Sequence, residues 1–253
     1  VNTREESRLN VLNIDLSGDF GGFELPGGAP AWAFGYESRR ESAASFPDGG
    51  ASIGAIAFTP GETTGGSYKV DEYYAEVQLP ILSGVPLAEV LTVEASFRLT
   101  DVNFLNDTGD VYKLAAEWAP IEDIRFRATY SEGFRAPNIS ELFLGQQQSA
   151  ESYTDPCRNY GSSGVSATTV ANCQADGLAP NFNLATFQAT TLQGGNPNLQ
   201  PEEAETVSFG IVIQPRMIEN LTINLDFYDI KIENAIATAP TSEVISVGAF
   251  DFQ

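Results

Sequence analysis

Five charged side chains lie where they could guide a ligand or form ion pairs with another part of a protein. Glu94, Arg98, Glu117, Arg125 and Arg127 occur in segments in which every second residue is apolar. Because successive side chains of an extended chain point to opposite faces, all five belong to the polar faces of predicted strands. Such a ladder of charges could guide a ligand or bind another domain through ion pairs. Cross-strand pairing that only satisfies the strands themselves explains the pattern equally well.

A second group of candidate ligand contacts lies in residues 144–195, which are rich in aromatic and amide side chains. Aromatic faces stack on sugar rings, and amides form hydrogen bonds with hydroxyl groups. We therefore expect Tyr153, Tyr160, Phe182 and Phe187 to form a platform for a sugar or a siderophore. A cap without a ligand is the alternative. Long loops concentrate function, which favours binding.

The composition argues against most catalytic, metal-binding and nucleic-acid-binding functions. The chain has no histidine, and it has neither a nucleophile-elbow motif nor a phosphate-binding loop. We expect no enzyme activity, no metal and no cofactor. Asp107 and Asp110 could hold calcium, although a plain hairpin turn explains them better. A formal net charge of −21 disfavours contact with nucleic-acid phosphates.

The two cysteines, Cys157 and Cys173, lie in a stretch rich in Gly, Ser, Asn and Asp. Neither belongs to a Cys-x-x-Cys motif, and no histidine is present to complete a zinc site. A disulfide that closes a long loop is the favoured interpretation, with two free thiols as the alternative. A disulfide implies an oxidising compartment.

Eight segments of about 8–11 residues alternate between apolar and polar side chains, which is typical of β-strands with one apolar face. This is the length that a tilted strand needs to cross a bilayer. The segments are 12–20, 32–39, 72–79, 91–100, 112–118, 124–131, 206–213 and 221–228.

Two all-β architectures produce this alternation: a soluble sandwich with its apolar faces inside, and a transmembrane barrel with its apolar face outside. The barrel is favoured because charges occur in the middle of strands and aromatic residues near strand ends. Short connections also alternate with long ones, the longest being 40–68 and 132–203. We therefore predict an antiparallel transmembrane β-barrel with long extracellular loops.

Three motifs resemble the barrel of TonB-dependent outer-membrane receptors. They are SEGFRAPNISELF at 131–143, GNPNLQPEEAET at 195–206 and DFYDIKIENAI at 226–236, in the family's order. Weaker similarity at 76–82 and 125–130 extends the resemblance to most of residues 70–240. The resemblance implies a bacterial outer-membrane location and uptake of a scarce nutrient, such as an oligosaccharide or a ferric siderophore.

The resemblance also implies parts that this sequence does not match. Members of the family have 22 strands and a plug inside the barrel, and an inner-membrane TonB complex engages the plug. We expect residues 1–253 to be about eight strands of such a barrel, with the plug elsewhere. The expected partners are membrane lipid, the rest of the receptor, the TonB complex and a small nutrient. A small complete barrel and a secreted adhesive or structural sandwich are the alternatives.

Arg135, within the first motif, has two interpretations. It could contact the substrate or the plug from the wall of the lumen. It could also form an ion pair with Glu132 or Glu141 that shapes the start of the long loop, and this is favoured because most charged loop residues are structural.

Overall fold

The computed structural model describes residues 3–53, 62–105, 109–184 and 186–238. Its main sheet contains β1 (Arg4–Asp19), β2 (Ala31–Phe46), β3 (Thr64–Val85), β4 (Ala88–Val102), β5 (Gly109–Ile121), β6 (Ile124–Arg135), β9 (Glu202–Ile213) and β10 (Ile223–Glu233). A second sheet pairs β7 (Gln147–Tyr153) with β8 (Phe187–Gln193), and the helices are α1 (Gly49–Ser52), α2 (Ile139–Phe143) and α3 (Ala167–Ala175).

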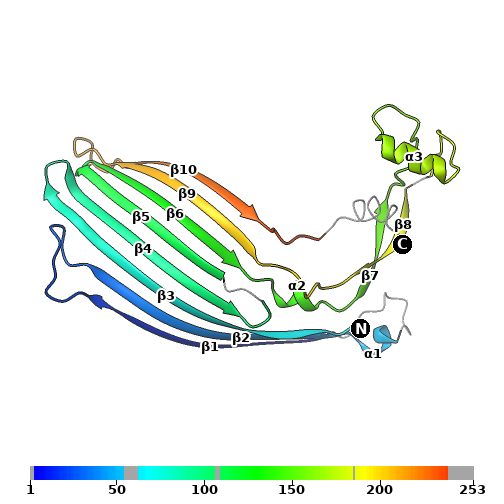
Figure 1. Cartoon of the computed structure of the whole chain (residues 1–253), viewed down its shortest axis with the longest axis horizontal. Coiled ribbons are helices and arrows are strands. Elements are labelled where there is room, and N and C mark those ends of the chain that lie inside the picture. Colours follow the sequence, from blue (N-terminus) through cyan, green and yellow to red (C-terminus); the bar gives the residue numbers. More distant parts are fainter. Residues whose placement is uncertain (1–2, 54–61, 106–108, 185, 239–253) are drawn as a thin grey trace.

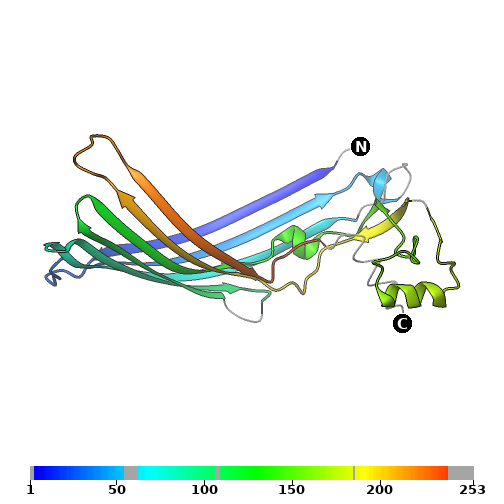
Figure 2. The ribbon, with the colours of Figure 1, turned by 90° about the horizontal axis from the view of Figure 1, so that it is seen from above.

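The eight strands of the main sheet follow one another in chain order, and all neighbours are antiparallel. The long segment between β6 and β9 leaves the sheet and returns to it. Figure 2 shows the sheet curved into a trough, with β1 and β10 along its two rims. In the described part of the chain β1 and β10 are not paired with each other, so the sheet is open.

All eight predicted strands are present, but several are longer than the expected 8–11 residues. β3 has 22 residues, and β1 and β2 have 16 each. The register of β2 and β3 continues to Ala43↔Gly66 and beyond. The sequence predicts shorter strands because apolar alternation ends before backbone pairing does.

The connections fall into two classes that lie at opposite ends of the sheet (Figure 1). At one end, here called the turn end, β3–β4 and β5–β6 are joined by two residues each, at 86–87 and 122–123. At the other, the loop end, β2–β3 and β6–β9 are joined by residues 47–63 and 136–201. The predicted alternation of short and long connections is confirmed for these four. The β4–β5 connection, residues 103–108, is shorter than the pattern, and the β1–β2 connection, residues 20–30, is longer than the two-residue turns.

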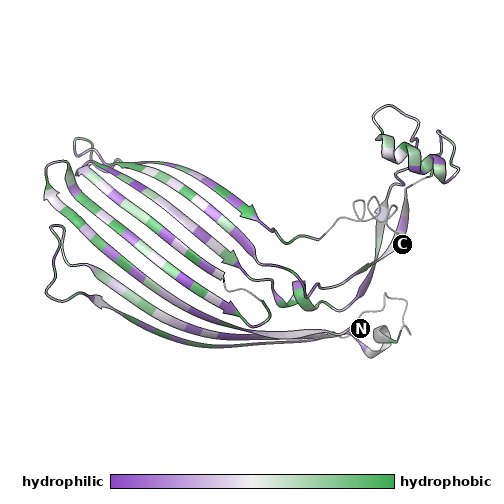
Figure 3. Cartoon of the chain, in the orientation of Figure 1, coloured by the Kyte–Doolittle hydropathy of each residue, from purple (hydrophilic) through white to green (hydrophobic). Residues whose placement is uncertain are grey.

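The two faces of the main sheet differ in character. Figure 3 shows apolar and polar residues alternating along the strands. On one face, here called the outer face, the apolar side chains are exposed: Leu16 is 63% exposed, Leu114 51% and Phe227 66%. A sandwich would cover these side chains with a second sheet, and no second sheet packs on them in the described residues. The soluble sandwich was therefore the wrong alternative.

The largest buried apolar cluster lies at the loop end, on the face opposite the exposed apolar band. Tyr68 and Val70 of β3 and Val102 of β4 pack there against Ile139 and Leu142 of α2. Figure 2 shows α2 on the hollow side of the sheet, which is here called the inner face. No helix among the described residues is long and apolar enough to cross a membrane.

Candidate functional site

Two rows of aromatic side chains bracket the exposed apolar band on the outer face. Toward the turn end, Trp118 stacks on Phe126 with ring centroids 5.4 Å apart. Toward the loop end, the rings of Tyr112 and Tyr130 are 5.5 Å apart. The rows are six residues apart on β5, or about 20 Å at about 3.3 Å per residue. Aromatic girdles flank the lipid-facing band of transmembrane barrels, which is about 25 Å tall.

The inner face carries the five predicted charges, and each has a partner within the sheet. Lys113 Nζ lies 3.7 Å from Glu94 Oε2, and Arg125 Nε lies 3.3 Å from Glu117 Oε1. Glu94 also accepts a hydrogen bond from the Gln78 amide at 3.1 Å. These partners come from neighbouring strands, so cross-strand pairing satisfies the charges.

Two arginines of the ladder pair with acids that the sequence analysis did not single out. Arg98 Nη1 lies 3.8 Å from Glu72 Oε1 on β3. Arg127 Nη2 donates to both carboxylate oxygens of Asp226, at 2.7 and 2.8 Å. Arg127 and Asp226 remain about half exposed on the inner face. No sequence signal identified Asp226, because its partner is 99 residues away.

Arg135, the last residue of β6, joins the starts of two other elements. Its Nε lies 2.6 Å from Glu202 Oε2 on β9, and its Nη1 lies 3.1 Å from Glu141 Oε2 in α2. The predicted ion pair with Glu141 is thus confirmed. Glu132 is not a partner, because it lies three residues before Arg135 on β6 and so points to the opposite face, where it accepts from the Tyr130 hydroxyl. The second partner of Arg135, Glu202, was not predicted from the sequence.

Glu202 is the acceptor at the centre of this junction. Arg135 donates to its carboxylate, and the backbone N–H of Ile236 donates to Oε1 at 2.7 Å. These two sets of hydrogen bonds, the arginine first, lower the pKa of Glu202 from 4.5 to about 2. The Glu202 and Glu141 carboxylates raise the pKa of Arg135. The junction lies beyond the aromatic row that contains Tyr130, and therefore outside the apolar band.

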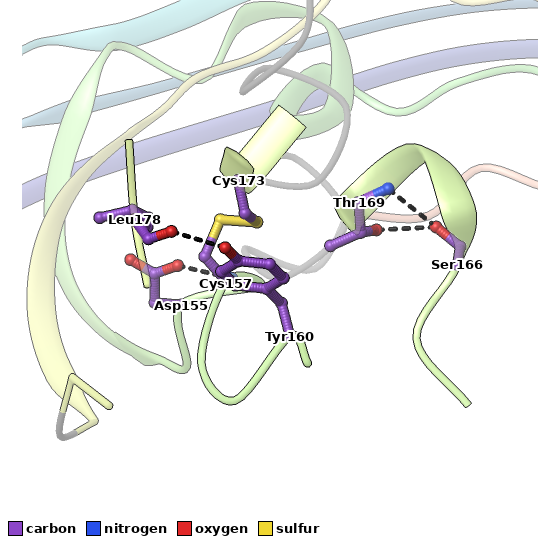
Figure 4. Close-up of a disulfide and its surroundings, with 7 residues drawn as sticks. All are labelled: Asp155, Cys157, Tyr160, Ser166, Thr169, Cys173 and Leu178. Carbon is purple, nitrogen blue, oxygen red and sulfur yellow. Dashed lines mark hydrogen bonds between the residues drawn. A yellow bond between two sulfur atoms is a disulfide. The ribbon is translucent and has the colours of Figure 1, made fainter. Parts of the chain in front are cut away.

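Residues 155–184, here called the disulfide module, lie at the tip of the β7–β8 ribbon (Figure 1). Cys157 and Cys173 form the predicted disulfide, with 5.6 Å between their Cα atoms. Figure 4 shows the Tyr160 ring beside it, with the Tyr160 hydroxyl donating to the Leu178 carbonyl at 2.5 Å. Tyr160 is 1% exposed, so its ring belongs to the interior of the module.

The other predicted aromatic ligand contacts are Phe182 in the disulfide module and Tyr153 and Phe187 at the end of the ribbon. Phe182 is half-buried, and its carbonyl accepts from the Asn159 N–H at 2.6 Å. The backbones of Tyr153 and Phe187 pair at the end of the ribbon, whereas their side chains lie outside the described part of the chain. A ligand role for these aromatic residues and for Arg135 stays a prediction.

The alternative calcium site is only partly described. Asp107 lies outside the described residues, and Asp110 is exposed at the start of β5. Among the described residues, no three Asp, Glu, Cys or His side chains are grouped so that they could hold a metal ion.

Solved structures of siderophore receptors share this fold. The siderophore receptor PirA from Pseudomonas aeruginosa is similar with a TM-score of 0.55 and 14% identity, over 90% of this chain and 32% of that one. PirA from Acinetobacter baumannii has a TM-score of 0.54 and 14% identity, over 90% of this chain and 27% of that one. The third structure is a mutant of the ferric enterobactin receptor PfeA from P. aeruginosa in complex with enterobactin. It has a TM-score of 0.53 and 14% identity, over 91% of this chain and 27% of that one.

The chain spans about a third or less of the length of these receptors. No curated protein matches the sequence. The family described as TonB dependent receptor-like, beta-barrel, matches residues 2–251. Its match covers almost the whole sequence, and the open antiparallel sheet with an exposed apolar band is part of such a barrel. The chain belongs to the TonB-dependent receptor β-barrel family.

Proposed function

We propose that residues 1–253 form part of the wall of a larger outer-membrane barrel that takes up a scarce nutrient. The observation that carries the proposal is the opposite character of the two faces of one curved sheet. The outer face exposes an aliphatic band between two aromatic rows, and the inner face carries ion-paired side chains. An apolar band suits lipid, and a charged face suits a wet lumen.

In the described part of the chain the outer edges of β1 and β10 have no neighbouring strand, which supports the proposal that further strands complete the barrel. Exposed strand edges present unpaired N–H and C=O groups, and within a bilayer every such group needs a partner. β1 has 16 residues and β10 has 11, so among the residues that the structure describes each edge leaves a long row of these groups open. In this proposal the turn end faces the periplasm, and the loop end with the disulfide module faces the outside.

The proposed partners follow from this placement. Membrane lipid covers the outer band, and the missing strands pair with β1 and β10. A plug domain occupies the hollow and contacts the inner-face charges, among them Arg98 and Arg127, which remain about half exposed. The inner-membrane TonB complex supplies energy through parts outside this chain. The ligand is a small nutrient, an oligosaccharide or a ferric siderophore, and the protein is a transporter rather than an enzyme.

Two measurements test the proposed function. The first is the intact mass of the natural protein extracted with detergent from outer membranes. We expect a mass several times the 27.2 kDa of this chain. A mass close to 27.2 kDa, or recovery as a folded protein without detergent, would contradict the proposal.

The second measurement is uptake by whole cells of labelled oligosaccharides and labelled ferric chelates, with and without the gene. We expect uptake of one class to require the gene and to stop when a protonophore collapses the proton gradient. Gene-dependent uptake that continues without the gradient would show a passive pore instead.

A further inference from the structure

A pocket of about 750 Å³ lies at the loop end, among α2, the end of β8 and the segment that follows β10. We call it the rim pocket. Its size falls within the range of small-molecule sites in proteins. All but one of the polar side chains in its described lining are uncharged hydroxyls and amides, among them Asn138, Ser140, Thr190, Thr191, Gln193 and Asn196.

Several of these polar groups are available to a ligand. In the part of the chain that the structure describes, the side chains of Ser140, Thr190 and Gln193 make no hydrogen bond or ion pair. All three residues are exposed. A hydroxyl both donates and accepts, and an amide offers two donors and one acceptor. Together they suit a ligand with many hydroxyl groups.

The rim pocket offers no free charge of either sign among its described lining residues. Glu141 is the one charged residue of that lining. The Glu141 carboxylate is already engaged, because it accepts from Arg135 Nη1 at 3.1 Å and from the Asn138 backbone N–H at 2.7 Å. No lysine or arginine of the described chain lines the pocket to attract an anionic chelate. A charged ligand would therefore enter without a counter-charge, at a desolvation cost.

The remaining lining is aliphatic. Leu144, Leu192, Leu199 and Ile236 lie around the polar groups, and Leu192 is 59% exposed. Sugar rings carry apolar C–H faces beside their hydroxyl groups. A surface that alternates aliphatic carbon with hydroxyls and amides complements both features.

We propose that the rim pocket binds an uncharged, hydroxyl-rich ligand of the oligosaccharide class. This inference rests on the proposed uptake function and supplies its substrate class. Within the proposed barrel, the pocket lies at the outward-facing end, where a ligand from the medium first meets the receptor.

The test uses the full-length receptor in detergent and calorimetric titration with neutral hexasaccharides of glucose, xylose and N-acetylglucosamine. A ferric tris-catecholate complex serves as the anionic probe. We compare the wild type with the double variant Thr190→Val/Gln193→Leu, which removes two hydrogen-bonding groups at nearly constant volume. Thr168→Val/Gln174→Leu on α3 is the matched control, because both of its residues are exposed and lie outside the pocket.

We expect saturable binding of a neutral hexasaccharide, weakened about tenfold or more by the pocket variant and unchanged by the control. Unchanged heat-modified mobility on a gel verifies that each variant is folded. Equal binding by wild type and pocket variant overturns the assignment of the site. Binding of the catecholate alone, or of neither class, overturns the ligand class.

The two proposals fail in different ways. Proton-gradient-dependent uptake of a ferric chelate by cells would leave the proposed uptake function standing while removing the oligosaccharide inference. If cells with and without the gene take up both classes of ligand equally, the proposed uptake function itself is contradicted.

Discussion

Arg127 on β6 and Asp226 on β10 form a bidentate ion pair although β9 lies between their strands. Gly210 of β9 is the register partner of both residues. Its missing side chain leaves the space that the pair occupies, because a Cβ at this position would lie 2.6 Å from Arg127 Nε. The pair thus depends on a glycine between its members.

The opposite rim of the sheet repeats this relationship. The Tyr74 hydroxyl of β3 donates to Asp15 of β1 across Gly35 of β2, which pairs in register with both. A Cβ on Gly35 would overlap the Tyr74 ring. In each case the glycine lies on the strand next to the rim, and the polar bridge spans two strands on the inner face.

The Gly210→Ala variant should break the Arg127–Asp226 ion pair. We expect it to lower the free energy of unfolding by about 1–3 kcal/mol, because the added methyl group must displace Arg127 or Asp226. The measurement is urea unfolding of the refolded receptor in detergent. Gly133→Ala on β6 is the control, since its nearest side-chain contact would be the Ala204 Cβ at 3.4 Å. Equal effects of the two variants would contradict the account.

Lysine substitutions distinguish the two faces of β4. Phe97→Lys places a charge in the exposed apolar band, close to the level of its register partner Tyr112, and should cost about 1–2 kcal/mol of stability in a bilayer, between the costs at the midplane and at the interface. Ser96→Lys places the same charge on the inner face, opposite Glu76 and Lys113 in register, and should cost much less. Unfolding from lipid vesicles in guanidinium measures both. Similar costs at the two positions would argue against a lipid-facing band.

Loss of the disulfide should open the disulfide module and leave the main sheet intact. In the chain-entropy model the bridge contributes roughly 3 kcal/mol, so Cys157→Ala/Cys173→Ala should lose most hydrogen-exchange protection in residues 155–184. Tyr160→Phe removes only its bond to Leu178 and should lower protection by about 1 kcal/mol. Protection that survives removal of both cysteines would show that the module is held by other contacts.

Stability should depend on pH through Glu202. Its pKa is about 2 in the folded chain and is lowered from 4.5. A lowered acid pKa stabilises the fold fully above pH 4.5, and the contribution is lost as the pH falls from 4.5 toward 2. In Glu202→Gln, the free energy of unfolding should therefore fall less steeply between pH 4.5 and pH 2 than in the wild type. Unfolding curves recorded across this pH window measure the difference. Glu203→Gln, which leaves the contact with Arg135 intact, should keep the wild-type slope.

The main sheet was predictable because its signal is local. Each strand core alternates within its own residues, so the strands around Phe97 and Phe209 could be found without knowing their neighbours. Other elements gave weaker signals. The β7–β8 ribbon has no sustained alternation, and α3 has only nine residues, with the Ser166 cap as its one start signal.

The partners within the candidate site were predictable only where they are close in sequence. Glu141, six residues from Arg135, was expected, whereas Glu202, 67 residues away, was not. The same holds for Asp226. The rim pocket joins three separate segments, so no motif within one segment could have shown it.

The most direct test of the central claim is the accessibility of spin labels on β4 of the full-length receptor in lipid vesicles. Labels at Ala95→Cys and Phe97→Cys should collide with oxygen, which concentrates in the bilayer. Labels at Ser96→Cys and Arg98→Cys should not, because their side chains face the lumen. An oxygen accessibility that alternates with a period of two is the predicted result. Uniform accessibility, or alternation of the opposite phase, would contradict the assignment of the outer face to lipid.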